Sequence, residues 1–340
     1  MRHPLGKRLR YLKSAVYCSS AMVQQRLFKK RFPLGVVLYL TYRCNLRCPF
    51  CNFWSMTEEE MTTLQVFSLI DKLKQAGTQR LGLVGGEPTL RKDIEEIIGY
   101  SRKKGLFTTL CSNGKIEESK VRQLKYLDIL LLSLDGPKQV HDSLRGEGSY
   151  DGVIKTIEAA KDLGIEIWLS ALLMNGSLEY IDHIVGLSQK YDLKCSFQPV
   201  VRYSGSPEKI ENFSLGKEGL QAILKKLIDY KKTTDSIALS ESYLRFLYEF
   251  WPRINAANLP CFAGRMFCVI TPSGYVFPCQ PEKGQKGVSN VLTGDFKEIF
   301  SGLKKYECNQ CFCDSFMETN LLFSADQAAM WNIAKNMILK

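Results

Sequence analysis

Cys44-Asn45-Leu46-Arg47-Cys48-Pro49-Phe50-Cys51 places three thiols within eight residues, directly after an apolar run at Val36–Leu40 that has the composition of a β-strand. Three thiolates this close together can bind one iron–sulfur cluster, but a cluster of four irons requires four ligands. If no fourth protein ligand is supplied, one iron keeps an open coordination site, as catalytic metal centres do. A zinc knuckle is the alternative, although zinc sites usually pair their cysteines two and two across a longer gap.

The composition is that of a soluble globular protein with one large domain, or with one domain and a smaller one. Of 340 residues, 45% are hydrophobic and 24% charged, and no apolar run approaches the roughly 20 residues that cross a bilayer. No signal peptide is visible, so the twelve cysteines indicate metal or cluster ligation in a reducing compartment and predict a cytoplasmic protein. Only three histidines are present, which argues against histidine-rich zinc sites and Ser-His-Asp catalysis.

The net charge of +11 is a property of the N-terminal segment. Residues 1–57 contain eleven Lys or Arg and no acidic residue, and the remaining chain carries 35 basic and 35 acidic side chains. Residues 4–30 are predicted to form a helix in which basic residues flank an apolar stripe: Leu5, Leu9, Leu12, Val16, Val23 and Leu27. Such a helix packs its stripe against the rest of the protein, lies peripherally on an anionic membrane surface, or contacts RNA. Nucleic acid is the least favoured of these partners.

From residue 36 short apolar runs alternate with amphipathic stretches. Six runs are predicted as strands: Val36–Leu40, Arg80–Val84, Phe107–Cys111, Ile129–Ser133, Glu166–Leu172 and Lys194–Gln198. Five stretches between them are predicted as helices: Thr62–Ala76, Lys92–Lys104, Glu117–Lys125, Tyr150–Leu163 and Leu178–Lys190. This alternation predicts an α/β fold, a partial (β/α)6 TIM-like barrel with right-handed crossovers and chemistry at the carboxyl ends of its strands.

Glycine-rich and polar motifs fall at those strand ends. Gly85-Gly86-Glu87-Pro88 follows the second strand, where the glycines allow close backbone approach and the glutamate can accept hydrogen bonds from an ammonium group. Ser112-Asn113-Gly114 and Ser133-Leu134-Asp135-Gly136 close the next two strands, and Arg145 follows in a predicted loop that also holds His141. Each motif has a simpler interpretation, namely a tight turn, or for Arg145 a salt bridge to Asp142 or Glu147.

The C-terminal part contains a second group of cysteines: Cys261, Cys268, Cys279, Cys308, Cys311 and Cys313. Ile270–Pro278 is predicted as a hairpin-like turn that brings Cys261 and Cys279 side by side. A later CxxC at Cys308 and Cys311 can complete a four-thiolate cage. A structural zinc ion bound by four cysteines is a competing interpretation here, and either Cys268 or Cys313 can replace a chosen ligand.

The CxxxCxxC spacing, with Phe50 before the last cysteine, resembles the signature of the radical SAM superfamily, and the strand-end motifs strengthen the resemblance. It implies a [4Fe-4S] cluster on Cys44, Cys48 and Cys51 whose open iron binds S-adenosylmethionine. Reductive cleavage then gives a 5′-deoxyadenosyl radical that abstracts hydrogen from a substrate. The cofactor-binding residues that the resemblance implies are Phe50, Gly85, Gly86, Glu87, Asn113, Ser133, Asp135 and Arg145.

The spacing of Cys261, Gly274 and Cys279 resembles the opening of a SPASM or twitch subdomain, which implies an auxiliary [4Fe-4S] cluster on Cys261, Cys279, Cys308 and Cys311. The predicted organisation is a basic helix over residues 1–33, a barrel over 34–205, a helical connection over 206–256 and a twitch-like subdomain with a closing helix over 257–340.

The predicted partners are a reductant such as flavodoxin or ferredoxin and a small-molecule, peptide or lipid substrate. Residues 29–34, after the basic helix, also resemble radical SAM enzymes that act on isoprenoid lipids, which favours peripheral membrane contact. No residue is identified as a substrate base. The competing hypothesis is a non-enzymatic iron–sulfur electron carrier or a zinc-stabilised scaffold.

Overall fold

The computed structural model describes residues 4–200, 206–252, 259–280, 289–306 and 313–337. Its centre is a nine-stranded sheet in the order β6-β5-β4-β3-β2-β1-β7-β8-β9. The six predicted strands are present, each within one residue of its predicted bounds: β1 (Gly35–Thr41), β2 (Arg80–Gly85), β3 (Phe107–Ser112), β4 (Ile129–Ser133), β5 (Glu166–Leu173) and β6 (Lys194–Pro199). Neighbours among these six pair in parallel, as βα units require. The predicted α/β class with a parallel, barrel-like sheet is therefore confirmed.

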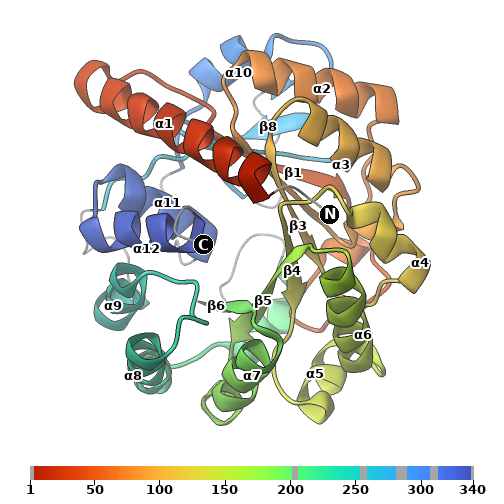
Figure 1. Ribbon diagram of the computed structural model, residues 1–340, viewed down its shortest axis with the longest axis vertical. Helices are drawn as coiled ribbons and strands as arrows, with labels where there is room; N and C mark the ends of the chain where they lie inside the picture. The colour runs from red at the N-terminus through yellow and green to blue at the C-terminus, as the bar shows by residue number, and fades with distance from the viewer. Residues whose placement is uncertain (1–3, 201–205, 253–258, 281–288, 307–312, 338–340) are drawn as a thin grey trace.

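The helices between these strands lie on the outer side of the curved sheet (Figure 1). Four match predicted stretches: α2 (Thr63–Gln75), α3 (Ile94–Lys103), α6 (Ser149–Asp162) and α7 (Ser177–Tyr191). The helix predicted over Glu117–Lys125 is only one turn, α4 (Glu118–Val121), followed by a 3-10 turn. The loop predicted around His141 is instead α5 (Lys138–Arg145), which starts directly after Pro137.

The two faces of the sheet differ in burial. The residues that face the helices are fully buried leucines and other apolar side chains, among them Leu38, Leu83 and Leu132, each 0% exposed. Burying each such leucine stabilises the fold by about 1.5–3 kcal/mol. The inner face is different toward the carboxyl ends of the strands, because Val84, Leu131 and Ser133 remain partly exposed there, whereas Phe107 and Ile129 are buried near the amino ends. The interior of the curved sheet is therefore reached by solvent, unlike the packed interior of a closed TIM barrel.

A seventh strand continues the sheet on the far side of β1. β7 (Phe267–Ile270) pairs in parallel with β1, with Gly35 opposite Phe267 and Leu38 opposite Ile270. The predicted hairpin is confirmed, because β8 (Tyr275–Phe277) returns antiparallel to β7. β9 (Ser289–Asn290) and α10 (Phe296–Gly302) follow.

Four more helices stand on the remaining side of the molecule (Figure 1): α8 (Lys217–Thr233), α9 (Glu241–Phe250), α11 (Asp314–Phe323) and α12 (Gln327–Met337). α11 contacts β6, and its Phe316 ring stacks on Phe267 of β7 with the ring centroids 4.9 Å apart. It therefore spans the side on which the sheet does not close. The last helix, α12, packs mainly on α9 and α11, because α11 lies between it and the sheet.

The N-terminal helix α1 (Pro4–Phe28) lies across the amino ends of the strands. Its buried residues are Ala21 and Gln25, and the Tyr17 hydroxyl lies against Gly77, just before β2. Arg26 also donates a hydrogen bond to the Ser324 carbonyl at 2.9 Å. The apolar stripe does not pack on the protein, because its described members Leu12, Val16, Val23 and Leu27 are 48–70% exposed. No helix in the described residues combines the length and hydropathy needed to cross a membrane.

Candidate active site

The cysteine loop begins immediately after β1, at the carboxyl end of the parallel strands. Cys44, Cys48 and Cys51 lie in one apolar cluster that also contains Phe50 and Met174. The Cys44 sulfur accepts hydrogen bonds from the Leu46 amide at 3.4 Å and from Asn113 Nδ2 at 3.8 Å. The Cys51 amide donates to the Cys48 carbonyl at 3.1 Å. The loop is thus ordered by its own backbone and by the end of β3.

The electrostatics of the loop oppose bare thiolates and favour a bound cation. Burial raises the pKa of the Cys44 thiol and raises the pKa of Cys48 to about 11. The Arg145 guanidinium acts in the opposite direction on the pKa of Cys48, whereas the thiols at Cys51 and Cys44 raise it further. Metal binding removes this mutual repulsion, because each thiolate then shares its charge with a cation.

The donor set fits an iron–sulfur cluster. Among the residues that the structure describes, no three His, Cys, Asp or Glu side chains are gathered as the ligands of a single metal ion would be. A cubane binds each thiolate at a different iron, so its ligands lie farther apart than those of a lone zinc ion. Cys44, Cys48 and Cys51 lie on one loop beside the Arg145 guanidinium, an arrangement that suits one thiolate on each of three irons.

Gly85 and Gly86 let the end of β2 pass directly against the cysteine loop. A Cβ at Gly85, whose φ is +144°, would lie 2.1 Å from the Thr41 carbonyl oxygen, and one at Gly86 would lie 2.3 Å from that of Arg43. The Gly86 amide donates to Thr41 at 2.9 Å and the Glu87 amide donates to Arg43 at 2.8 Å. The two glycines are therefore required by backbone packing, whatever else they bind.

The Glu87 carboxylate is completely buried and its hydrogen bonds come from the protein. It accepts from the Asn113 amide at 2.8 Å, from the Ser112 hydroxyl at 3.0 Å, and from the Thr89 amide and hydroxyl at 3.1 and 2.6 Å. Burial raises the pKa of this carboxyl, while these donors act against the increase. Glu87 thus joins the end of β2 to the end of β3, and we expect it to position the surrounding backbone.

Asp135 and Arg145 form a buried ion pair. Arg145 Nε donates to Asp135 Oδ2 at 2.5 Å, and the Leu172 amide donates to Oδ1 at 3.0 Å. Burial alone would raise the pKa of Asp135, but the charge and hydrogen bond of Arg145 hold it below its ordinary value. Neither Asp142 nor Glu147 is the partner of Arg145, so the salt bridges considered from the sequence are wrong. The guanidinium also lies 5.3 Å from the centre of the Phe50 ring.

His141 supports this pair from α5 and is not a loop residue. It is 0% exposed, and its Nδ1 accepts a hydrogen bond from the Asp135 amide at 3.2 Å. Burial, followed by the charge of Arg145, lowers the pKa of His141 to about 4. The ring is therefore neutral at physiological pH, and its buried Nε2 has no hydrogen-bond partner among the described residues.

Ser133 and Asn113 lie at the same end of the sheet. Ser133 is partly exposed at the end of β4, opposite Ser170 of β5, on the inner face. Asn113 is 6% exposed and its Nδ2 also donates to Asn45 Oδ1 at 2.7 Å, which links it to the cysteine loop. All eight residues implied as cofactor ligands therefore surround the carboxyl ends of β1 to β4.

The second group of cysteines is only partly described. Cys308 and Cys311 lie outside the described residues. Cys261, Cys279 and Cys313 pack against one apolar cluster inside the curved sheet. Cys268 is 0% exposed on the opposite face of β7, in the core beneath the helices. Of the two cysteines left open by the sequence, Cys313 therefore packs against the same apolar cluster as Cys261 and Cys279, and Cys268 lies on the other face of the sheet.

Two residues on the inner side were not identified from the sequence. Cys111 points inward from β3, and its side chain is open to the interior of the curved sheet. The protein that surrounds this interior raises the pKa of the thiol to about 12 by desolvation, with a contribution from Asp314. Asp314 begins α11, and burial also raises the pKa of its carboxyl. No local pattern marks Asp314, because it reaches the interior only through the packing of α11 on β6.

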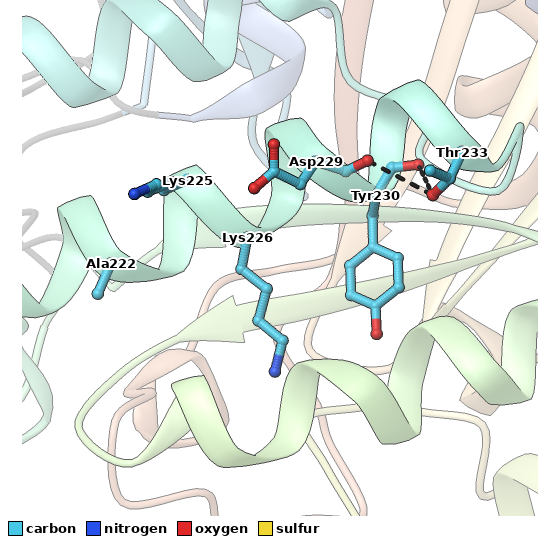
Figure 2. Close-up of a pocket in the computed structure, with 6 residues that line it drawn as sticks. All are labelled: Ala222, Lys225, Lys226, Asp229, Tyr230 and Thr233. Carbon is cyan, nitrogen blue, oxygen red and sulfur yellow. Dashed lines mark hydrogen bonds between the residues drawn. The ribbon is translucent and has the colours of Figure 1, made fainter.

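A groove on the outside of the molecule is separate from this site. It has a volume of about 380 Å³ and is lined by residues of α8: Ala222, Lys225, Lys226, Asp229, Tyr230 and Thr233 (Figure 2). Lys226 and Tyr230 reach Asp182 of α7, at 2.8 and 2.5 Å. None of the residues predicted to bind a cofactor lies in it.

The fold and the strand-end loop define the class of this protein, a partial (β/α) barrel with a three-cysteine cluster site. Residues 38–186 match the family model described as "Radical SAM superfamily". Residues 38–186 therefore form a domain of the radical SAM superfamily, whose members use a [4Fe-4S] cluster and S-adenosylmethionine.

Two curated relatives give the range of similarity. The chain is 31% identical over 224 residues to Fe-coproporphyrin III synthase of Methanosarcina barkeri, covering 63% of this chain and 55% of the relative. It is 25% identical over 278 residues to mycofactocin maturase MftC of Mycolicibacterium smegmatis, covering 79% and 70%. The chain thus spans little more than half the length of the first relative.

Solved structures of Streptococcus suis SuiB share the fold. SuiB bound to S-adenosylmethionine gives a TM-score of 0.68 at 19% identity, covering 82% of this chain and 68% of SuiB. SuiB bound to its precursor peptide SuiA gives a TM-score of 0.68 at 18% identity, covering 92% and 77%.

Proposed function

We propose that this protein is a radical SAM enzyme that cleaves S-adenosylmethionine at a [4Fe-4S] cluster held by Cys44, Cys48 and Cys51. When bound, this cofactor pair supplies a 5′-deoxyadenosyl radical that removes a hydrogen atom from the substrate. The observation that carries the proposal is the position of the three thiols, on one loop at the strand ends and beside the Asp135–Arg145 pair.

The chain's own residues hold the cofactors in this proposal. Arg145 offsets negative charge at Cys48, and Phe50 covers its guanidinium. Gly85 and Gly86 let the end of β2 pack directly on the backbone of Thr41 and Arg43, which positions the start of the cysteine loop. Glu87 and Asp135 fix the ends of β3 and β5 through their hydrogen bonds to Asn113 and Leu172.

We assign Cys261 and Cys279 to an auxiliary cluster, with Cys308 and Cys311 as its remaining ligands. Cys261, Cys279 and Cys313 pack against the same group of apolar residues, which supports Cys313 as a ligand in place of Cys308 or Cys311. Iron and sulfide content separates this assignment from structural zinc, because a zinc site leaves only about four irons per chain after reconstitution.

The substrate is proposed to occupy the interior of the curved sheet. Its inner face is partly exposed, and Ser133, Ser170 and Ser196 lie side by side there on β4, β5 and β6. With Asp314 nearby, this surface favours a substrate that donates hydrogen bonds, such as a peptide. SuiB, which shares the fold, has been solved bound to its precursor peptide SuiA, which is consistent with that class. The electron donor is proposed to be a flavodoxin or ferredoxin in a reducing, cytoplasmic compartment.

The test is anaerobic reconstitution with iron and sulfide, reduction with dithionite, and measurement of 5′-deoxyadenosine and methionine. The wild-type chain should form both, and Cys48→Ala should form neither because one cluster ligand is lost. Cys195→Ala is the matched control, since Cys195 is buried in the core on the helix side of β6, apart from both cysteine groups, and it should retain activity. A wild-type chain that holds the cluster but yields no 5′-deoxyadenosine would support the electron-carrier hypothesis instead.

A further inference from the structure

The outer face of α1 carries an apolar stripe that no described part of the protein covers. Leu12, Val16, Val23 and Leu27 are 48%, 70%, 55% and 69% exposed. At about 100° per residue, these four positions fall within an arc of about 60° on the helix surface. The opposite side of the helix holds Ala21 and Gln25, which are buried against the strand ends. Four large apolar side chains of α1 therefore point outward, while Cys18, Ala21 and Met22 pack against the protein.

This arrangement is the reverse of an ordinary surface helix, which turns its apolar stripe toward the core. Removing four large apolar side chains from water is favourable, because each contributes about 25 cal/mol for every Å² buried. The fold does not gain this burial free energy, because the four side chains remain exposed. The stripe therefore requires an explanation outside the packing of the chain itself.

The charges beside the stripe indicate what covers it. Lys13 and Arg26 lie about 70° from the centre of the stripe, one on each side. Lys29 and Lys30 follow directly after the helix and are exposed. The first acidic residue of the chain is Glu58, so the whole segment is positive. An apolar stripe with a cation on each side and two lysines at its end matches a membrane surface, where acyl chains lie beneath anionic phosphates.

We propose that the outer face of α1 is a docking surface for an anionic phospholipid bilayer. Leu12, Val16, Val23 and Leu27 insert among the headgroups, and Lys13, Lys29 and Lys30 lie at the level of the phosphates. Because α1 crosses the amino ends of the strands, the cysteine loop at their carboxyl ends faces away from the bilayer. Docking therefore attaches the protein without covering its candidate active site.

The test is co-sedimentation of the full-length protein with vesicles of phosphatidylcholine alone or with about 30% phosphatidylglycerol. The wild-type chain should bind the anionic vesicles and bind neutral vesicles at least about tenfold more weakly. The variant Val16→Ser, Val23→Ser, Leu27→Ser should lose at least about tenfold in affinity. Its matched control replaces three exposed apolar residues elsewhere, Leu64→Ser, Leu178→Ser and Met330→Ser, and should bind like the wild type.

The charge contribution is tested separately. Lys13→Gln, Lys29→Gln, Lys30→Gln should weaken binding to anionic vesicles on the order of a hundredfold, at about fivefold per lysine near the surface. Three exposed lysines distant from α1, Lys92, Lys155 and Lys217, provide the control when changed to glutamine. Raising the salt concentration should weaken wild-type binding more than it weakens binding of the lysine variant, which keeps the other basic residues of the segment.

Three results would overturn the proposal. The first is equal binding of the wild type and the serine variant to anionic vesicles. The second is a wild-type dimer in gel filtration that the serine variant converts to a monomer, since a second copy would then cover the stripe. The third is preferential binding of RNA over vesicles. Formation of 5′-deoxyadenosine without vesicles is measured in parallel, and the serine variant should retain it, so failure of docking is distinct from failure of the proposed enzyme activity.

Discussion

At the scale of single residues, Arg145 connects the cysteine loop to the end of the sheet. Its side chain is 10% exposed and that of its partner Asp135 is 0% exposed. Arg145→Gln leaves a buried carboxylate without its counter-charge, which should cost about 3 kcal/mol in the free energy of unfolding. It should also raise the pKa of Cys48 and lower the iron content after reconstitution. Urea unfolding and iron analysis measure the two effects.

The control for this substitution is an exposed ion pair. Lys138→Gln breaks the contact between Lys138 and Asp151, whose side chains are 56% and 49% exposed, and should change stability by less than about 1 kcal/mol. Adding Asp135→Asn to Arg145→Gln should restore part of the lost stability, because the unpaired charge is removed. An Arg145→Gln chain as stable as the wild type would show that solvent or another cation replaces the guanidinium.

His141 predicts a pH dependence with a defined sign. An unfolded histidine takes up a proton near pH 6.5, whereas the pKa of His141 in the fold is about 4. Its contribution to stability is therefore complete above pH 6.5 and is lost as the pH falls from about 6.5 to about 4. The loss is about 3 kcal/mol at 1.36 kcal/mol per pKa unit. His141→Gln should flatten this part of the stability–pH curve, and identical slopes for both chains would contradict the prediction.

At the scale of elements, the contact between β2 and the cysteine loop depends on the absence of two side chains. Gly86→Ala places a Cβ 2.3 Å from the Arg43 carbonyl oxygen, so the backbone of one segment must move. We expect a loss of about 2 kcal/mol in stability and weaker cluster retention. Gly186→Ala is the control, because it lies inside α7 with no heavy atom within 4 Å of the new Cβ and should stabilise the helix by about 0.5–1 kcal/mol.

The helices and strands also show which features can be predicted from the sequence and which cannot. β1 to β6 were found to within a residue because each apolar run ends in glycine or polar residues, and the Cys44–Cys51 spacing is local in the same way. The pairing of β7 with β1 joins segments more than 200 positions apart, so no local pattern contains it. The contact between Asp135 and Arg145 was missed because it depends on α5, which the pattern does not mark as a helix.

The orientation of helix α1 is a further feature that the sequence could not predict. Its spacing revealed an apolar stripe from the sequence, but periodicity cannot say what a stripe faces. The structure turns Ala21 and Gln25 inward and leaves Val16 and Leu27 exposed, and only the packing of α1 on the rest of the chain determines this. The sequence therefore predicts elements and strand-end motifs well, and it predicts contacts between distant elements poorly.

At the scale of the whole molecule, the sheet runs without interruption from the barrel into the C-terminal part. β7 pairs with β1 along Gly35 to Leu38, and Phe267 stacks on Phe316 of α11 at 4.9 Å. The cluster around Phe267 also includes Tyr39 of β1 and Leu34, so its apolar contacts extend across the junction. We therefore expect the barrel strands and β7 to unfold in one cooperative transition.

Phe267→Ala tests this coupling, since it removes the stacked ring without altering any cysteine. Replacing a buried phenylalanine by alanine lowers the free energy of unfolding by about 3–5 kcal/mol. If the sheet unfolds as one unit, this substitution destabilises β1 as well as β7. Hydrogen exchange of the β1 amides, Gly35–Thr41, should therefore accelerate by roughly the factor that the measured loss of stability implies. Tyr275→Ala on β8 is the control, because Tyr275 is 44% exposed and its removal should leave β1 protected. If Phe267→Ala accelerates exchange in β7 and β8 but not in β1, the C-terminal part unfolds independently of the barrel despite the shared sheet.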